Sequence, residues 1–467
     1  TLRPDPAAEV RDGTVRNHVS LERATRQAAP QRLFQNRVTP ALPGLCFLGV
    51  VESRAPLDEE ELGLLQAAAS ITDQIGGGRG RGLGLVSVSL AELPAAESPV
   101  REVAPETTAL LLVLEAEEPL HLSSVKDPTN YVTSKDYLDG STVRGAVAAA
   151  LGGTEDDADL DLLLAGESPA VFGDGRPGGA CAIPAPMTLQ VSKRGSQRHD
   201  PPVDLAALLC AEVCAGRPGS RPEDVRTAQG TFTWGAAGWH AFKVKRRTVT
   251  RTARDHASGR AADGQLFSLE VVDPVLERAG LECGRRLRFY VPVFGSREQL
   301  ALALKAAEAG LAVGGDRSRG FGRLRLVDVR SETPLPPVAL RHAAWAERVS
   351  RLGVPAPEST GVLLAVGPLA VSHQRLVDAL AAAGLELVEG VARRHAHGGW
   401  NAKIHLPRSL SSHYLPGSTF VVVRTDKTSA LPALAGLERD GLGPGRPDGW
   451  GRLIACHPIH VDCCKEE

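Results

Sequence analysis

The stretch VGGDRSRGFGRL, residues 313–324, carries the pattern that decides how the rest of this chain is organised. Two other twelve-residue stretches align with it without gaps: IGGGRGRGLGLV at 75–86 and LGPGRPDGWGRL at 442–453. Each has a glycine after an apolar residue, a central arginine and a Gly-apolar-Gly run. The aligned positions are Gly76, Gly314 and Gly443; Arg79, Arg317 and Arg446; Gly82, Gly320 and Gly449; and Gly84, Gly322 and Gly451. Three windows with the same arginine indicate an internal repeat.

The sequence around each glycine loop repeats as well. A helical pattern precedes each loop, at 58–69, 297–309 and 429–439, and a strand-like segment follows each, at 83–90, 321–329 and 450–457. A second similarity pairs Tyr137-Leu-Asp-Gly-Ser-Thr142 with Tyr414-Leu-Pro-Gly-Ser-Thr419, and a looser one pairs residues 15–34 with 249–267. The repeating unit is therefore helix, glycine loop, strand.

The order of the elements predicts an α+β fold built from tandem ferredoxin-like modules. Residues 107–330 are expected to form strand 108–117, helix 141–151, a long insertion at about 153–240, strands 241–250 and 285–293, and then helix, loop and strand. Residues 359–467 follow the same βαββαβ order, which is also the RRM-like order, without a large insertion. Residues 1–95 contain only the second half of a module. Proline-rich stretches at 96–106 and 331–358 are expected to be linkers.

Composition limits the classes of protein that fit. The chain has 467 residues, of which 43% are hydrophobic and 23% charged, enough for several globular cores. Neither a signal peptide nor an apolar run of membrane-spanning length is present, and the only methionine is Met187, so a fragment or processed chain is expected. Eight cysteines without a regular spacing favour a reducing cytoplasm. The sequence has no P-loop. In a Rossmann fingerprint the glycines lie between a strand and the following helix, whereas here they follow a helix and lead into a strand, which argues against a dinucleotide site.

The glycine loops and one basic stretch are the candidate nucleic-acid contacts. Glycines let backbone amides approach a phosphate, and arginine offers a planar fork to phosphate oxygens or a face to a base. The net charge is −2, but residues 243–254 are densely basic, and local charge decides where a polyanion docks. Imperfect alternation places basic groups on both faces of a strand or on a hairpin arm. The alternative is that the glycine loops are purely structural turns.

These motifs resemble those of the RAMP superfamily, proteins of type III CRISPR effector complexes. The resemblance rests on residues 314–323, on Leu-Asp-Gly-Ser-Thr-Val-Arg-Gly-Ala at 138–146 and on 259–267. Residues 107–467 resemble the two-module, cap-like RAMP protein of subtype D systems, including 398–401 and 416–419, and residues 1–95 resemble part of a backbone RAMP module. Departures from the family pattern are Asp139, Leu85 and Asp448, the last of which makes the third loop less cationic.

The resemblance implies a subunit of a ribonucleoprotein that binds crRNA along its backbone, inserts a thumb-like hairpin between bases, packs against other effector subunits and meets target RNA. The candidate RNA-binding residues are Arg79, Arg81, Ser141, Arg144, Lys243, Lys245, Arg246, Arg247, Arg251, Arg317, Arg319, Arg323, Trp400 and Arg446. A membrane partner is not expected.

Two kinds of chemistry stay open as alternatives. Backbone members of the family can cut target RNA with an aspartate in the loop before the Gly-Ser helix, which makes Asp127, and after it Asp136, candidates for a metal-dependent endoribonuclease. The non-catalytic interpretation of these aspartates is a solvated loop carboxylate or an Asp-Pro turn at 127–128. Cys181, Cys210 and Cys214 could hold zinc, although buried free cysteines are more common. A protein–protein scaffold without RNA contact is the third possibility.

Overall fold

The computed structural model describes residues 3–4, 14–21, 28–38, 46–48, 57–76, 83–91, 103–123, 131–152, 157–193, 201–216, 221–235, 238–254, 261–278, 281–330, 335–397, 400–401, 406–407 and 411–463. The chain divides into two compact units, Thr1–Ala96 and Glu97–Glu467. In the described residues no helix is long and apolar enough to cross a membrane.

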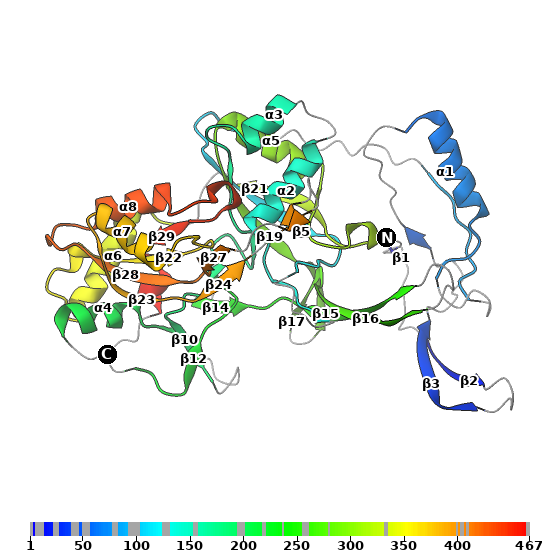
Figure 1. Ribbon diagram of the computed structural model, residues 1–467, viewed down its shortest axis with the longest axis horizontal. Coiled ribbons are helices and arrows are strands. Elements are labelled where there is room, and N and C mark those ends of the chain that lie inside the picture. Colours follow the sequence, from blue (N-terminus) through cyan, green and yellow to red (C-terminus); the bar gives the residue numbers. More distant parts are fainter. Residues whose placement is uncertain are drawn as a thin grey trace. The chain divides into compact units, whose positions relative to one another are not determined.

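The middle module is a sheet covered on one face by helices (Figure 1). Its central strand is β5 (Ala109–Ala116), flanked by β19 (Arg288–Phe294) and β21 (Arg323–Arg330), and the sheet continues to β20 (Leu311–Ala312) beyond β21 and to β7 (Val171–Phe172) beyond β19. Helices α2 (Gly140–Leu151) and α5 (Arg297–Glu308) pack together over the core face. Counting the four main strands along the chain gives the spatial order 4-1-3-2, the ferredoxin-like arrangement that the sequence predicts.

One element of this module was assigned incorrectly from the sequence. The place of the second strand is taken by β7 and β8 (Arg176–Pro177), which pair with β19, and residues 241–250 lie outside the sheet. The physical reason is length. Strands β7 and β8 are two residues each and together complete the edge of the sheet beside β19, so this edge does not need a segment with a strong strand pattern. The stronger strand pattern at 246–254 forms a hairpin instead.

The insertion is a layer of short strands and two helices. It contains α3 (Asp157–Leu164) and α4 (Ala206–Ala215), with β9 (Ile183–Pro184), β10 (Leu189–Ser192), β11 (Val203–Asp204), β12 (Val225–Thr227), β13 (Thr231–Gly235) and β14 (Gly238–Phe242). Ile183, Leu189 and Phe232 form a shared core with Val366 and Ile454 of the C-terminal module. The insertion therefore covers a face of the next module's sheet.

The C-terminal module follows the predicted order closely. Its elements are β22 (Thr360–Ala365), α7 (His373–Ala382), β23 (Glu386–Val391), β28 (Thr419–Val423), α8 (Leu431–Asp440), β29 (Leu453–Ala455) and α9 (Ile459–Asp462). The sheet order β23-β28-β22-β29 is again 4-1-3-2 read from the other edge. All six residues of β22 are buried, which is typical of a strand with both sheet faces covered.

The stretch 331–358, expected to be a linker, contains a helix that packs on this module. Residues 338–351 form helix α6 (Val338–Arg351), on which Trp345 and Val349 are fully buried against the C-terminal core. Apolar residues at positions i and i+4 give this helix its buried stripe. Helix α4 of the insertion packs beside α6.

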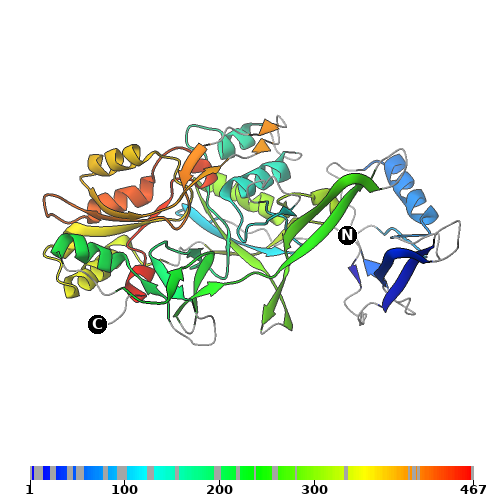
Figure 2. The same ribbon diagram turned by 60° about the horizontal axis from the view of Figure 1, so that its bottom comes forward.

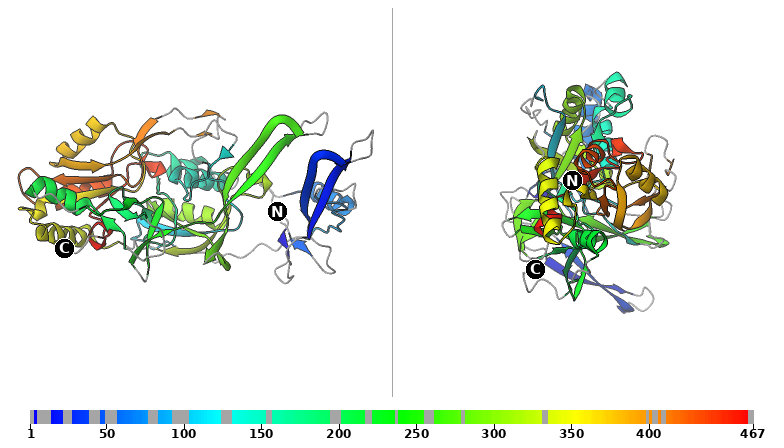
Figure 3. Two further views of the ribbon diagram at one scale, coloured as in Figure 1. Left: turned by 90° about the horizontal axis from the view of Figure 1, so that it is seen from below. Right: turned by 90° about the vertical axis from the view of Figure 1, so that its left-hand side faces the viewer.

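Two long β-hairpins have the same register. In β15 (Arg246–Arg254) and β16 (Ala261–Val272), Arg247 pairs with Val271 and a bulge precedes the last pair, Arg254 with Ala261. In β2 (Thr14–Leu21) and β3 (Ala28–Val38), Thr14 pairs with Val38 and a bulge precedes Leu21 with Ala28. Each position is shifted by the same number of residues, so the looser sequence similarity marks a true structural repeat. Figures 2 and 3 show both hairpins as long ribbons.

The first unit resembles half of the middle module. Helix α1 (Glu59–Ile71) begins with a capping box at Asp58 and Glu61, as α5 does at Ser296 and Gln299. Helix α5 buries Leu300, Ala303 and Ala307 completely, whereas none of the residues of α1 is buried. In the part of this unit that is described, residues 83–90 have only an isolated bridge, Gln74 with Leu85, and no strand equivalent to β5. The remaining strands are β1 (Arg3–Pro4) and β4 (Phe47–Leu48).

The second sequence similarity does not mark equivalent positions. Tyr137–Thr142 leads into helix α2, but Tyr414–Thr419 joins β27 (Ser411–Tyr414) to strand β28. A short match of turn-forming residues suits both contexts, because a Gly-Ser-Thr run can begin a helix or end a turn.

Candidate functional site

The three glycine loops share one backbone geometry. The amide of the first residue donates to the carbonyl of the third aligned glycine: Ile75 N to Gly84 O at 2.8 Å, Val313 N to Gly322 O at 2.9 Å, and Leu442 N to Gly451 O at 2.8 Å. Gly84, Gly322 and Gly451 all have positive φ, of 79°, 95° and 74°. A Cβ on any of them would lie 2.0, 2.1 or 2.4 Å from the carbonyl oxygen of that same first residue.

The glycines are therefore required by the loop itself. In the second loop Gly314 and Gly320 also have positive φ, and a 3-10 turn spans Arg317–Arg319. In the third loop Gly443 and Gly449 match them, with a 3-10 turn at Arg446–Asp448. In the first loop Gly76 has positive φ, while Arg79, Arg81 and Gly82 lie outside the described residues. Such closed loops present their central side chains on a rigid backbone.

The second loop is joined to the β15–β16 hairpin. Arg251 of the hairpin forms an ion pair with Asp316 at 2.9 Å, and its guanidinium lies 4.9 Å from the centre of the Phe321 ring. Phe321 packs with Leu269 and Val271 of the hairpin in a small apolar cluster. Neither link was foreseen from the sequence, where the linked residues are at least 50 positions apart. The base of the hairpin and the loop thus form one continuous site.

Exposed arginines surround this site in excess over the carboxylates. Arg317 is exposed and, among the described residues, forms no hydrogen bond or ion pair. Asp316 forms ion pairs with both Arg251 and Arg319. Two further carboxylates, Glu115 and Glu117, form ion pairs with three arginines: Arg288, Arg323 and Arg325. Because each carboxylate is shared, this end of the sheet keeps a net positive charge.

Most of the basic stretch 243–254 is strand β15 of a hairpin arm, with basic groups on both faces, as predicted; Lys243 and Lys245 come just before the strand. Arg246 pairs with Glu270 at 3.0 Å on one face, and Arg247 lies 3.8 Å from Asp273 on the side that also carries Arg251. Lys243 is exposed and Lys245 is half-buried. Leu266 of the same arm is 60% exposed, a large apolar side chain without cover.

The third loop differs because it points into the protein. Arg446 is partly buried and donates from Nη2 to the carbonyl of Arg439 at 2.9 Å, at the end of α8. Asp448 pairs with Arg144 of helix α2 at 3.0 Å, and Gly140 and Gly449 each lie against the backbone of Phe172. Of these two candidates for RNA contact, Arg144 thus holds the third loop on the middle module, and Arg446 holds it on the end of α8. Ser141, in the first turn of α2, is half-buried.

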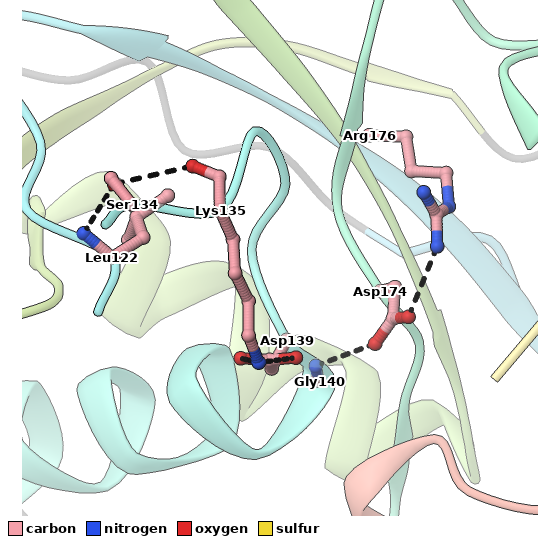
Figure 4. Close-up of polar contacts among 7 residues, drawn as sticks. All are labelled: Leu122, Ser134, Lys135, Asp139, Gly140, Asp174 and Arg176. Atoms are coloured by element: carbon pink, nitrogen blue, oxygen red, sulfur yellow. Dashed lines mark hydrogen bonds and ion pairs between the residues drawn. The ribbon is translucent and has the colours of Figure 1, made fainter. Parts of the chain in front are cut away.

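A buried carboxylate lies at the start of α2 (Figure 4). Asp174 accepts from the amide of Gly140 at 3.0 Å and from Arg176 Nη2 at 3.4 Å. Beside it, Lys135 Nζ lies 2.7 Å from Asp139. Burial, with a smaller contribution from Asp139, raises the pKa of Asp174 to about 6, although Arg176, the Gly140 amide and Lys135 oppose the rise.

This pKa predicts a pH dependence of stability. Because folding raises the pKa of Asp174 above its ordinary value, the folded state binds the proton more tightly. The stabilisation from this proton is fully present below pH 3.8, the ordinary pKa of the group, and is lost as pH rises through 6. We expect the wild type to lose up to about 3 kcal/mol more unfolding free energy than Asp174→Asn between pH 4 and 7. Urea unfolding at several pH values measures this, with the exposed Asp328→Asn as control; parallel curves for wild type and Asp174→Asn would contradict it.

The described residues leave the catalytic candidates untested and separate the metal candidates. Asp127 lies outside the described residues, and Asp136 is half-buried in the loop before α2. Cys210 and Cys214 lie on α4 and pack in the C-terminal core, whereas Cys181 packs with the insertion core, so these three cysteines do not form a zinc site. No group of three His, Cys, Asp or Glu residues able to hold a metal occurs in the ranges that the structure covers. For Trp400, in β25 (Trp400–Asn401), the structure describes only the backbone, which pairs with β26 (Leu406–Pro407).

Comparison with known proteins agrees with the fold. Residues 8–87 and 235–325 match the model of the RAMP superfamily, and each match contains a long hairpin, a helix and a glycine loop. None of the curated proteins matches the chain.

Several solved structures are similar at low identity. They include a chain of Type III-B Cmr-beta bound to cognate target RNA and AMPPnP (14% identity, TM-score 0.39, covering 67% of this chain and 86% of that one). A chain of the apo Type III-B Cmr-beta (14%, TM-score 0.27, 48% and 98%) and a CRISPR associated protein Cas6 (8%, TM-score 0.30, 75% and 99%) are similar too.

The fold and the site define a class of protein in which ferredoxin-like modules carry a glycine loop beside a long hairpin arm. The repeated hairpin, capped helix and closed loop occur in both stretches that match the family model. Through these two stretches the chain is similar to the RAMP superfamily.

Proposed function

We propose that this chain is a crRNA-binding structural subunit of a type III CRISPR ribonucleoprotein, working in the cytoplasm with other effector subunits and with target RNA. The observation that carries the proposal is the union of the second glycine loop with the β15–β16 arm through Arg251, Asp316 and Phe321. A rigid loop with exposed arginines next to a basic arm suits the backbone of a single-stranded RNA.

The residues divide between the two parts of this surface. Arg317, Arg319 and Arg323 contact phosphates at the loop, and Lys243, Lys245, Arg246 and Arg247 do so along the arm. Leu266, exposed on the arm, contacts a base, because an apolar side chain can fill the gap between unstacked bases. The β2–β3 hairpin shares the register of the arm, and Arg79 and Arg81 align with the arginines of the second loop, so we assign the same role to them.

A salt titration tests the proposal. The double variant Arg317→Gln/Arg319→Gln removes two exposed cations and leaves the glycines in place. We expect its affinity for single-stranded RNA to fall roughly tenfold at moderate salt. The slope of log affinity against log salt should fall by about 1.4, since each phosphate contact contributes about 0.7 on single strands. Fluorescence anisotropy with the full chain, or with the assembled complex, measures both quantities.

Arg351→Gln on α6 is the matched control, since Arg351 is 65% exposed and its partner Glu347 is on the same helix. Its binding curve should coincide with that of the wild type. If the double variant also coincides with the wild type, the loop arginines do not contact RNA, and the scaffold interpretation replaces this one.

A further inference from the structure

A cavity of about 110 Å³ lies between the open face of the middle sheet, the insertion and the C-terminal module. Tyr290, Pro292 and Phe294 line it from β19, and Ile183 and Cys181 line it from the insertion. Polar groups also reach it: Asp174, Arg176, Arg452 and His457. Asp174 and Arg176 bond to each other, as Figure 4 shows, and both line the cavity beside Arg452 and His457.

His457 offers a buried donor to this cavity. Its side chain is fully buried, and its Nδ1 accepts a hydrogen bond from the amide of Ile459 at 3.2 Å. Since Nδ1 accepts, the neutral ring carries its proton on Nε2. That Nε2 has no hydrogen-bond partner among the described residues. Burial lowers the pKa of His457 well below its ordinary value, and so the ring is a neutral N–H donor at pH 7.

Arg452 offers a guanidinium. This guanidinium stacks over the Phe294 ring at 4.6 Å, and within the described part of the chain it donates no hydrogen bond and forms no ion pair. Burial lowers the pKa of Arg452 to about 10, so the group stays charged at neutral pH. Gly173 lies flat against it: a Cβ there would be 2.2 Å from Nη1. The side chain of Arg452 is partly buried, and the charge of Asp174 stabilises it, but none of the described carboxylates or carbonyls accepts a hydrogen bond from its guanidinium, so these donors are available to an anion in the cavity.

We propose that this cavity binds a terminal phosphate group, with Arg452 and the Nε2 proton of His457 as donors and Tyr290 and Phe294 as the apolar walls. A guanidinium and an N–H donor match phosphate oxygens. A cavity of about 150 Å³ holds one benzene ring, so this one takes a phosphate or a single ring but not a whole nucleotide. A phosphomonoester fits better than an internal diester, which must continue in two directions.

Two sources carry this group: the end of an RNA strand, or a free phosphate or nucleotide. The RNA source rests on the proposed function; the free source does not. The full chain is titrated with RNAs of one sequence that carry a 5′-phosphate, a 3′-phosphate or hydroxyls at both ends, and separately with inorganic phosphate and cytidine monophosphate. Fluorescence anisotropy measures binding of the RNAs, and ³¹P and histidine ¹⁵N NMR measure binding of phosphate and cytidine monophosphate.

We expect one phosphorylated end to bind about tenfold to hundredfold tighter than the hydroxyl end, the effect of a charge-assisted hydrogen bond. His457→Asn keeps an acceptor for the Ile459 amide but removes the Nε2 donor, and Arg452→Gln removes the charge; both abolish the difference. Gly173→Ala should weaken it by displacing the guanidinium. Arg351→Gln should leave it unchanged.

The outcomes separate cleanly. If phosphate or the monophosphate shifts the His457 Nε2 resonance while RNA ends bind alike, the site stands and its ligand is the free anion. Loss of all RNA binding would overturn the proposed function but not this site. Equal binding of all RNA ends, with no NMR change in the wild type, means that only water occupies the cavity and overturns the inference, whether or not the variants fold.

Discussion

Gly322→Ala should lower the free energy of unfolding of the unit Glu97–Glu467 by roughly 2–4 kcal/mol and abolish the RNA contact that we propose for the second loop. The φ of Gly322 is +95°, which costs an alanine backbone strain, and its Cβ would lie 2.1 Å from the Val313 carbonyl oxygen. That oxygen belongs to the backbone, so it cannot move aside as a flexible side chain could. Opening the loop also breaks the bond from the Val313 amide.

Gly145→Ala is the matched control for this substitution. Gly145 lies on α2, and a Cβ there meets nothing within 4 Å. Alanine in a helix should stabilise the unit by about 0.5–1 kcal/mol. Urea unfolding of the full chain measures both changes. Should the two variants differ little in stability, the loop has another conformation available, and the triple repeat is not the rigid element that we infer.

The sequence predicted the elements whose residues are constrained locally. The three glycine loops were recognisable because closing each turn forces glycine at fixed positions, as Gly84, Gly322 and Gly451 show. The C-terminal module was predicted almost completely, since its helices have apolar stripes and capping residues such as Ser372. The middle module's second strand was missed, because β7 and β8 are two residues each and carry no periodicity.

The candidate site was predicted in its parts and not in its arrangement. Arg317 and Arg251 were both selected from local charge, but their neighbourhood depends on the ion pair to Asp316 and on the packing of Phe321. Arg446 aligns with Arg317, yet it turns inward because α8 ends beside it and offers the Arg439 carbonyl. Equivalent sequence positions thus have different surroundings. The donors His457 and Arg452 were not singled out, since burial and a missing partner leave no sequence signal.

Glu438→Ala should destabilise the C-terminal module by roughly 3–5 kcal/mol, because it leaves a buried charge without its counterion. Glu438 on α8 accepts from Arg341 of α6 at 2.7 Å and from the amide of Ala455 in β29 at 2.7 Å. The Arg341 side chain is only 3% exposed and also donates to the carbonyls of Pro336 and Ala455. One carboxylate therefore joins the helix before the module, the helix before the third loop, and the strand after it.

Glu347→Ala provides the comparison for that prediction. Glu347 pairs with Arg351 one turn along α6, both about two-thirds exposed, and such surface pairs contribute about 0.5 kcal/mol or less. Hydrogen exchange of α6 and urea unfolding followed by tryptophan fluorescence report the difference, since Trp345 is fully buried on this helix. Equal stability of the two variants would mean that water replaces Glu438 at Arg341. A large gap would instead identify this carboxylate as the group that holds α6 and the third loop in register with the sheet.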